Sequence, residues 1–300
     1  MNTDPVPVTL VVLTLNEEQN LADCLQSVKG WAGEIFIVDS GSTDGTIDIA
    51  EGCGARVITH QFETHARQWK WALENLPVST DWVLALDADQ RVTPELRQEI
   101  SGVIEADDPA LKGAYVRRRQ VFRGKWIKHG GYYPKYLLKL FRTGAARVDE
   151  TDLVDHHFRV DGRVIKLKHD IVEDNRNERD ISVWIAKHNR YAVLQAREEL
   201  QRRRPDGAAS ARGRPLGSPD ERVLWAKRLW SRLPLYLRPF AYFTYRYFFR
   251  LGFLDGKQGF IFHFLQAFWY RLLVDIKLDE LGRKEAQETQ APAEVVELER

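Results

Sequence analysis

Hydrophobic periodicity in the first third of this 300-residue chain restricts the fold more than any other feature of the sequence. Short apolar runs typical of buried strands alternate with stretches in which apolar residues recur at helical spacing. The predicted strands are residues 8–15, 34–40, 55–60 and 81–89, and the predicted helices between them are residues 16–31, 43–54 and 64–76. Such alternation predicts a parallel sheet, whose ligand crevice lies at the carboxyl ends of the strands.

Polar residues follow three of these predicted strands directly. They form the clusters 14–17, 39–42 and 87–89, in the sequences TLNE, DSGS and DAD. Because the carboxyl ends of parallel strands share one edge of a sheet, we expect the three clusters to converge.

The rest of the chain predicts a mixed sheet and a helical extension. Residues 112–174 carry strand and turn signals, and residues 178–204 predict a helix. We therefore expect an α/β domain at 1–204, with a mixed, mainly parallel sheet flanked by helices. Residues 205–220 are rich in Pro, Gly, Ala and Ser, which predicts a flexible linker. The last residues, 283–300, predict a disordered or loosely helical tail.

Aromatic residues concentrate in the predicted C-terminal extension, residues 221–282. Of the 14 Phe, 10 Tyr and 9 Trp of the chain, 15 lie between Tyr236 and Tyr270, interleaved with arginines. This mixture is typical of amphipathic helices at a bilayer interface, where rings sit at the headgroup boundary and arginines meet phosphates. The alternative is that the helices pack on the core and their arginines are solvated.

Overall charge and cysteine content narrow the class of protein. The 44 Lys and Arg nearly balance the 43 Asp and Glu, so no global basic field indicates a nucleic-acid partner. The two cysteines predict neither a disulfide framework nor a cysteine zinc site, which favours a reducing cytoplasm. We expect no secretion signal, and no segment reaches the roughly 18 uncharged apolar residues of a spanning helix.

Asp87 and Asp89 form the most informative motif. Two carboxylates held close together repel each other, and a divalent cation stabilises such a pair. Mg²⁺ or Mn²⁺ bound there would neutralise a substrate diphosphate and help it to leave. The alternative interpretation is an ordinary surface turn. Asp39, also at a strand end, can accept hydrogen bonds from a base or ribose, whereas Asp44 is better explained as a helix cap.

Four motifs together resemble a known family. VVLTLNEEQNL, IVDSGSTDGT, THARQWKWAL and WVLALDAD occur in the order and spacing of the inverting family 2 glycosyltransferases, which have a GT-A nucleotide-binding fold. The resemblance covers about residues 7–175. Later motifs, GGYYPKYLLKLFR, WIAKHNRYA and RLGFLDGKQGF, are similar to enzymes that build bacterial envelope glycans such as the lipopolysaccharide core, and extend it to about residue 280.

The resemblance implies roles for individual residues. It implies that the nucleotide sugar contacts Thr14, Asn16, Glu17, Asp39, Gln68 or its neighbour Arg67, Asp87 and Ala88, and that the metal ligands are Asp89 and Asp87. Two positions depart from the family pattern: Gln90 stands where the family often has Glu, and His65 where it often has Gly.

The catalytic base is expected in the sequence RVDETDLVDHHF. An inverting transfer needs a carboxylate that takes the proton of the acceptor hydroxyl. The candidates are Glu150, Asp152 and Asp155, and Asp155 is preferred because two histidines follow it. His156 is a further candidate metal ligand. Four residues are candidates for contact with the acceptor. The rings of Tyr132 and Tyr133 can stack on sugars, and the cations of Lys135 and Arg142 can bind phosphate on a lipid.

The sequence thus predicts a metal-dependent glycosyltransferase, peripheral on the inner face of the cytoplasmic membrane. Its expected reaction moves a hexose from a nucleotide sugar, such as a UDP-sugar, to a lipid-linked saccharide. This prediction has three alternatives. The first is transfer to a polyprenyl phosphate, and the second is a non-catalytic membrane adaptor that binds nucleotide sugars. The third, a metal-dependent phosphatase, is disfavoured because no second metal cluster or clear nucleophile is present.

Overall fold

The computed structural model describes residues 5–148, 157–203 and 232–290, together with positions 216, 222, 225, 226, 229 and 230. The chain divides into two compact units. The first comprises Met1–Trp184 and Tyr247–Ile261, and the second comprises Ile185–Arg246 and Phe262–Arg300.

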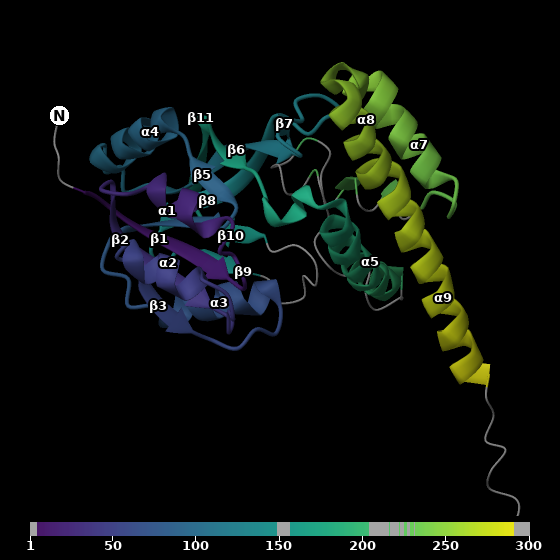
Figure 1. The fold of residues 1–300 in the computed structure, drawn as a ribbon, viewed down its shortest axis with the longest axis horizontal. Helices are drawn as coiled ribbons and strands as arrows, with labels where there is room; N and C mark the ends of the chain where they lie inside the picture. The colour runs from purple at the N-terminus through teal and green to yellow at the C-terminus, as the bar shows by residue number, and fades with distance from the viewer. Residues whose placement is uncertain are drawn as a thin grey trace, which may run out of the picture. The chain divides into compact units, whose positions relative to one another are not determined.

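A nine-stranded sheet forms the centre of the first unit (Figure 1). Its strand order is β3-β2-β1-β4-β8-β6-β11-β5, with β7 paired to β6, and β9 and β10 form a separate small sheet. The strands are β1 Val6–Thr14, β2 Ala32–Asp39, β3 Arg56–Thr59, β4 Trp82–Asp87, β5 Gln90–Val92, β6 Leu111–Phe122, β7 Lys125–Trp126, β8 Lys135–Arg142, β9 Ala146–Val148, β10 Phe158–Val160 and β11 Arg163–Glu173.

The direction of the strands confirms the predicted mixed, mainly parallel sheet. β1 pairs in parallel with both β2 and β4, and β2 pairs in parallel with β3. β8 is antiparallel to β4 and to β6, whereas β11 is parallel to β6. Two reversals restore the original direction, so β6 and β11 end at the same edge of the sheet as β1, β2 and β4.

Helices cover both faces of this sheet (Figure 1). They are α1 Leu21–Gln26, α2 Thr46–Gly52, α3 His65–Asn75 and α4 Pro94–Glu105. Side chains of β1 alternate between the two faces: Leu10 packs in the cluster that includes α1, α2 and α4, and Val11 in the cluster that includes Trp69 of α3. This alternation is what a strand buried on both faces requires.

The first helix is much shorter than the sequence predicts. Residues 16–31 were expected to be helical, but α1 spans Leu21–Gln26. Asn16 has a positive φ of 56°, and the backbone N–H of Glu17 donates to the hydroxyl of Thr46 rather than entering a helix. Hydrogen bonds to a neighbouring loop therefore override the helical periodicity of this stretch.

The second unit is helical. Its main elements are α5 Ile181–Arg203, α7 Arg238–Thr244 and α9 Tyr270–Gln290, and α8 Gly256–His263 joins the two units in sequence. Ala192 and Ala196 of α5 pack against Tyr270, Val274 and Leu278 of α9. Among the described residues, no helix is long and apolar enough to cross a bilayer.

A buried ion cluster joins the helices of the second unit. The side chain of Arg238 has no exposed area, and it donates to Asp275 Oδ1 and Glu199 Oε1 over 2.7 Å each. α9 continues to Gln290, so residues 283–290 are helical; they are the first part of the segment for which the sequence predicts a disordered or loosely helical tail. The side chain of Arg283 pairs with Asp279 one turn earlier at 2.8 Å, which supports the helix there.

Candidate active site

The three predicted polar clusters lie at one edge of the sheet. In the register of the parallel strands, Thr14 is paired with Asp39, and Leu13 with Asp87. The loops that follow β1, β2 and β4 therefore begin side by side, as the order of strands and helices predicts.

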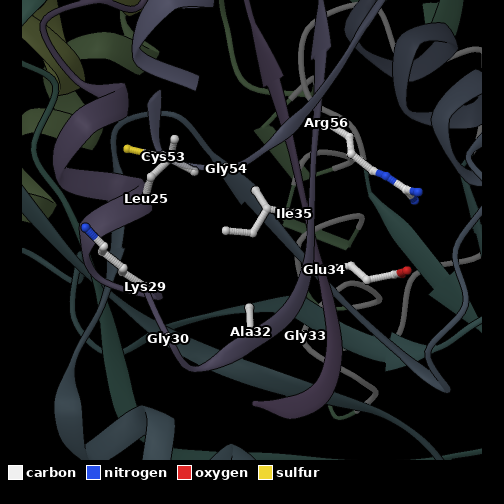
Figure 2. A pocket seen from close by; sticks show the side chains of 10 residues that line it. All are labelled: Leu25, Lys29, Gly30, Ala32, Gly33, Glu34, Ile35, Cys53, Gly54 and Arg56. Carbon is white, nitrogen blue, oxygen red and sulfur yellow. The ribbon is translucent and has the colours of Figure 1, made fainter. Parts of the chain in front are cut away.

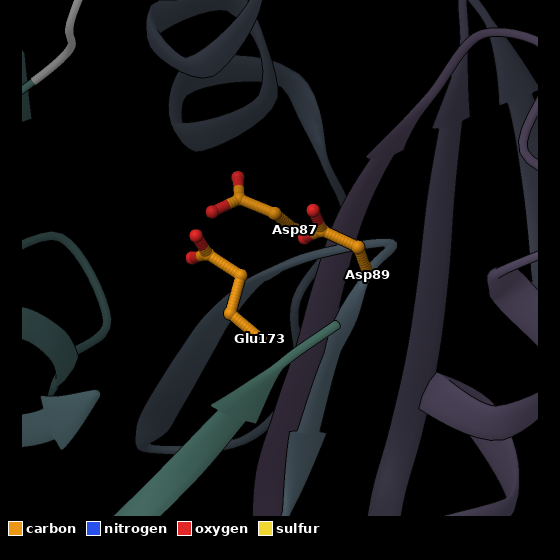
Figure 3. A group of neighbouring side chains, drawn as sticks. All are labelled: Asp87, Asp89 and Glu173. Atoms are coloured by element: carbon orange, nitrogen blue, oxygen red, sulfur yellow. The ribbon is translucent and has the colours of Figure 1, made fainter. Parts of the chain in front are cut away.

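An acidic cluster forms the centre of this edge. Carboxylate oxygens of Asp87, Asp89 and Glu173 lie within 4.8 Å of one another, and all three residues are partly exposed (Figure 3). Glu173 ends β11 and pairs with Gln90 of β5. Oxygen ligands at this spacing fit Mg²⁺ or Mn²⁺, so the chemistry of the group agrees with a divalent-cation site.

Positive charge and amide donors hold the cluster together. The buried Lys139 places its Nζ 2.9 Å from Asp87 Oδ2, and Arg118 Nη1 lies 3.1 Å from Glu173 Oε1. The fully buried Gln90 donates from Nε2 to Asp87 Oδ2 at 2.7 Å and to Glu173 Oε2 at 2.8 Å. Two cations and one amide thus offset the repulsion among three carboxylates.

Replacing Gln90 with glutamate is expected to destabilise the metal-free protein by roughly 2 kcal/mol or more, because two hydrogen bonds to carboxylates are lost and a fourth negative charge is added. The same charge favours a divalent cation, so the rise in thermal midpoint on adding Mn²⁺ is expected to grow. Gln90→Leu is the control, since it removes the donors without adding charge. Equal Mn²⁺ shifts in the two variants would contradict this account of the cluster.

Cys24 lies beneath the acidic residues. Burial raises the pKa of its thiol far above the usual range, and the charges of Asp89 and Asp87 raise the pKa further. The side chain of Cys24 is fully buried and belongs to the apolar cluster that includes α1, α2 and α4.

Asp39 is fully buried and organises the loop after β2. Its Oδ1 accepts the backbone N–H groups of Gly41 at 2.9 Å and Ser42 at 2.8 Å. Its Oδ2 accepts the hydroxyls of Thr14, at 2.8 Å, and of Ser42. Donors of the chain therefore fill the acceptor positions of this carboxylate, and a role toward a base or ribose stays a prediction.

The loop after β1 is bonded to the loop after β2. The side-chain oxygen of Asn16 accepts the backbone N–H of Thr43 at 2.8 Å, and the backbone N–H of Asn16 donates to the hydroxyl of Ser42 at 2.8 Å. Burial would raise the pKa of Asp44, but hydrogen bonds from the hydroxyl and N–H of Thr46 lower it. The N-cap residue of α2 is Gly45, so Asp44 is not the cap itself; it lies one residue earlier and accepts the N–H of Thr46, the first residue of the helix.

Gln68 supports these loops from α3. It is buried, and its Nε2 donates to the hydroxyl of Ser40 and to the carbonyl of His60, both at 3.1 Å. The preceding Arg67 is exposed and pairs with Glu63. Of these two neighbours, Gln68 is therefore the one that holds the predicted nucleotide loop.

The predicted base and acceptor residues have different outcomes. Glu150, Asp152, Asp155 and His156 lie outside the described residues, so their roles stay predictions. Tyr133 donates its hydroxyl to Asp170 at 3.0 Å; burial raises the pKa of this hydroxyl, and the hydrogen bond to Asp170 raises it further.

The prediction for Arg142 is wrong. In the register of β8 and β4, this residue lies opposite Trp82, at the start of β4, whereas Asp87 is at the end of that strand. The guanidinium carbon of Arg142 lies 4.5 Å from the centre of the Trp82 ring. The reason is that β8 runs antiparallel to β4, which carries the carboxyl end of β8 away from the acidic cluster. Lys135, at the start of β8, lies opposite Arg118 of β6 in the register of the two strands.

The residues that the sequence predicts for the site do not include Glu173, Lys139 or Asn177. Asn177 Nδ2 lies 3.4 Å from Glu17 Oε2, so the segment after β11 reaches the loop after β1. A signal for Glu173 was present, because the strand GRVIKLKHDIVED ends in acids as the strand before Asp87 does. Lys139 offered no comparable signal within an otherwise apolar run.

A pocket of about 420 Å³ lies elsewhere on the first unit (Figure 2). Residues 32–35, which begin β2, form one wall, with Lys29 and Arg56 also lining it. Asp39 ends the same strand, so this pocket is at the opposite edge of the sheet and contains none of the predicted site residues.

The fold and the acidic edge define an α/β protein with a candidate divalent-cation site, and comparison with known proteins gives the family. The family model "Glycosyl transferase family 2" matches residues 9–160. The chain belongs to this family of glycosyltransferases. This confirms the resemblance inferred from the four motifs, and with it the predicted GT-A type of fold.

Individual relatives agree with this assignment. The lipopolysaccharide core biosynthesis glycosyltransferase LpsC of Rhizobium meliloti is 30% identical over 213 residues, which cover 65% of this chain and 73% of LpsC. An uncharacterized glycosyltransferase of Rickettsia felis is 40% identical over 108 residues, or 36% of this chain. The match spans 38% of that rickettsial relative's length.

Two solved structures illustrate more distant similarity. Glucosyl-3-phosphoglycerate synthase from Mycobacterium tuberculosis, in complex with Mn²⁺, UDP and glucosyl-3-phosphoglycerate, has a TM-score of 0.31 and 23% identity, covering 38% of this chain and 44% of that one. S. aureus TarS 1-349 has a TM-score of 0.40 and 14% identity, covering 93% and 91%.

Proposed function

We propose that this glycosyltransferase moves a hexose from a nucleoside diphosphate sugar, in particular a UDP-sugar, to a saccharide on a bacterial envelope lipid. The transfer inverts the anomeric configuration and depends on Mg²⁺ or Mn²⁺. The observation that carries the proposal is the cluster of Asp87, Asp89 and Glu173 beside the loops that follow β1 and β2.

In this proposal Asp89 and Asp87 hold the cation, with Glu173 as an additional ligand. A cation bound there supplies charge neutralisation for the departing diphosphate. Thr14, Asn16, Glu17, Asp39, Gln68 and Ala88 shape the nucleotide pocket. Lys139 and Gln90 keep the Asp87 carboxylate in one orientation, since both bind its Oδ2. Preorganised ligands of this kind reduce the reorganisation needed when the donor binds.

Asp155 is the proposed base. It would take the proton of the acceptor hydroxyl while that oxygen attacks the anomeric carbon from the face opposite the leaving group. The new glycosidic bond forms as the bond to the diphosphate breaks, and the nucleoside diphosphate leaves with the electron pair. Inversion follows from this single in-line displacement.

The proposed acceptor is a lipopolysaccharide core saccharide or a similar lipid-linked glycan. Similarity to LpsC over 73% of its length supports this choice. We place the reaction at the cytoplasmic face of the membrane. The free thiols of Cys24 and Cys53 suit a reducing compartment, and the aromatic C-terminal segment suits a lipid surface.

The test is to incubate the protein with labelled nucleotide sugars, Mn²⁺ and one class of lipid acceptor at a time. We expect label in the lipid-linked saccharide and release of the nucleoside diphosphate. Label found exclusively in a polyprenyl phosphate would replace the proposed acceptor by the alternative one. No turnover of any donor with any acceptor would favour the non-catalytic adaptor.

A further inference from the structure

One segment of the first unit exposes several large apolar side chains. We call residues 247–261, the second part of that unit, the docking turn. Its most exposed apolar side chains are Phe248 (55%), Phe249 (75%), Leu251 (47%), Phe253 (43%), Leu254 (54%) and Phe260 (47%). Single exposed apolar residues are common on proteins, but a group concentrated in one short segment marks an interaction surface.

The backbone of the docking turn has a defined shape. Leu251 and Gly256 have positive φ angles of 60° and 67°. A Cβ at Gly259 would lie 2.5 Å from the Cβ of Asp255 and 2.9 Å from the carbonyl of Gly252. The sequence LGFLDGKQG, residues 251–259, therefore specifies a close-packed turn in which Leu251, Phe253 and Leu254 are exposed.

Hydrogen bonds join the docking turn to the segment between strands β7 and β8. The carboxylate of Asp255 is buried, accepts the backbone N–H of His129 at 2.8 Å, and lies 2.7 Å from Nδ1 of the same residue. The N–H of Gly130 donates to the carbonyl of Arg250 at 2.8 Å. His129 and Gly130 lie between β7 and β8, and β8 carries Lys139 to the acidic cluster.

The exposed charged side chains of the docking turn and of residues 123–135, which it contacts, are all positive. Residues 123–135 contain no Asp or Glu, and in residues 247–261 the one carboxylate is that of the buried Asp255. The exposed cations of the two segments are Arg123, Lys125, Lys128, Lys135, Arg250 and Lys257. Apolar rings beside cations, without exposed carboxylates in these described segments, complement the anionic headgroups and acyl boundary of a bilayer.

We propose that the docking turn inserts its apolar tip into the interface of a bilayer containing anionic phospholipid, with the surrounding lysines and arginines on the headgroups. The inference rests on the proposed function, because it names the element by which the enzyme reaches the surface that holds its acceptor. The bond between Asp255 and His129 keeps the lipid-bound tip and the acidic edge of the sheet in one rigid unit.

Flotation of the full chain with vesicles tests this inference. We expect binding to vesicles of phosphatidylglycerol and phosphatidylcholine, weaker binding to phosphatidylcholine vesicles, and loss of binding at high salt. The double variant F249S/L254S should lower the vesicle partition coefficient at least tenfold. F62S is the matched control, because Phe62 is 46% exposed on the same unit but outside the docking turn. Circular dichroism and the thermal midpoint establish that each variant is folded.

Several outcomes would overturn the inference. One is a folded F249S/L254S variant that binds vesicles as the unmodified chain does. Another is a double variant that changes the oligomeric state in light scattering but still binds vesicles. The docking turn would then mediate self-association instead of lipid binding. Failure of the proposed function looks different: vesicle binding would still depend on Phe249 and Leu254, but no labelled donor would be consumed.

Discussion

Replacing Asp89 with alanine is expected to lower kcat/KM for sugar transfer by roughly a hundredfold or more. The variant loses a carboxylate of the cluster at the end of β4, and stabilisation of a leaving diphosphate by a bound cation amounts to several kcal/mol. Initial rates with labelled donor, measured over a range of Mn²⁺ concentrations, report the effect. The variant should also lose the Mn²⁺-dependent part of donor binding.

Asp48→Ala provides the control for this experiment. Asp48 is an exposed aspartate on α2, outside the acidic cluster, so its removal changes net charge by the same amount and should leave the rate within twofold. If Asp89→Ala remains as active as Asp48→Ala, the DAD motif is an ordinary surface turn and the proposed cation site is wrong.

Replacing Arg238 with leucine is expected to cost about 3–5 kcal/mol of unfolding free energy. The guanidinium is completely buried between Glu199 and Asp275, and its removal takes from both buried carboxylates the cation that they share, while Arg203 stays paired with Glu199. Urea denaturation followed by tryptophan fluorescence and circular dichroism measures the loss. Arg197→Leu, at an exposed position of α5, should change stability by less than about 0.5 kcal/mol.

A compensating variant separates lost charge pairing from lost packing. Replacing Arg238, Glu199 and Asp275 together by apolar residues of similar volume should recover most of the stability, because all three buried charges of the cluster are then removed and Arg203, which pairs with Glu199, is partly exposed. A single Arg238→Leu variant as stable as the unmodified chain would contradict the described ion cluster.

The parallel half of the sheet could be predicted from the sequence because its information is local. Each strand is a short apolar run followed by a helical segment, and the carboxyl ends of such strands share an edge. The position of Asp39 and Asp87 at the same edge of the sheet could therefore be predicted without knowing any tertiary contact. Family membership confirmed what the four motifs indicated about the class of protein.

Non-local pairing limited the remaining predictions. Whether β8 runs with or against β4 depends on hydrogen bonds between distant segments, and this direction decides that Lys139 reaches Asp87 while Arg142 does not. Glu173 joins the cluster because β11 pairs with β5 and β6, which no local pattern determines. The helical pattern at 16–31 failed for a similar reason, since Asn16 and Glu17 bond to the loop after β2.

The central claim is that the carboxylates at this edge bind a divalent cation together with a nucleoside diphosphate sugar. Thermal-shift titration of UDP-sugars with and without Mn²⁺ tests it most directly, because a ligand at one hundred times its Kd adds about 2.7 kcal/mol to folding stability. We expect one diphosphate sugar to raise the thermal midpoint when Mn²⁺ is present, and Asp89→Ala to remove this effect. A donor-induced shift of equal size without the cation, or in Asp89→Ala, would contradict the account.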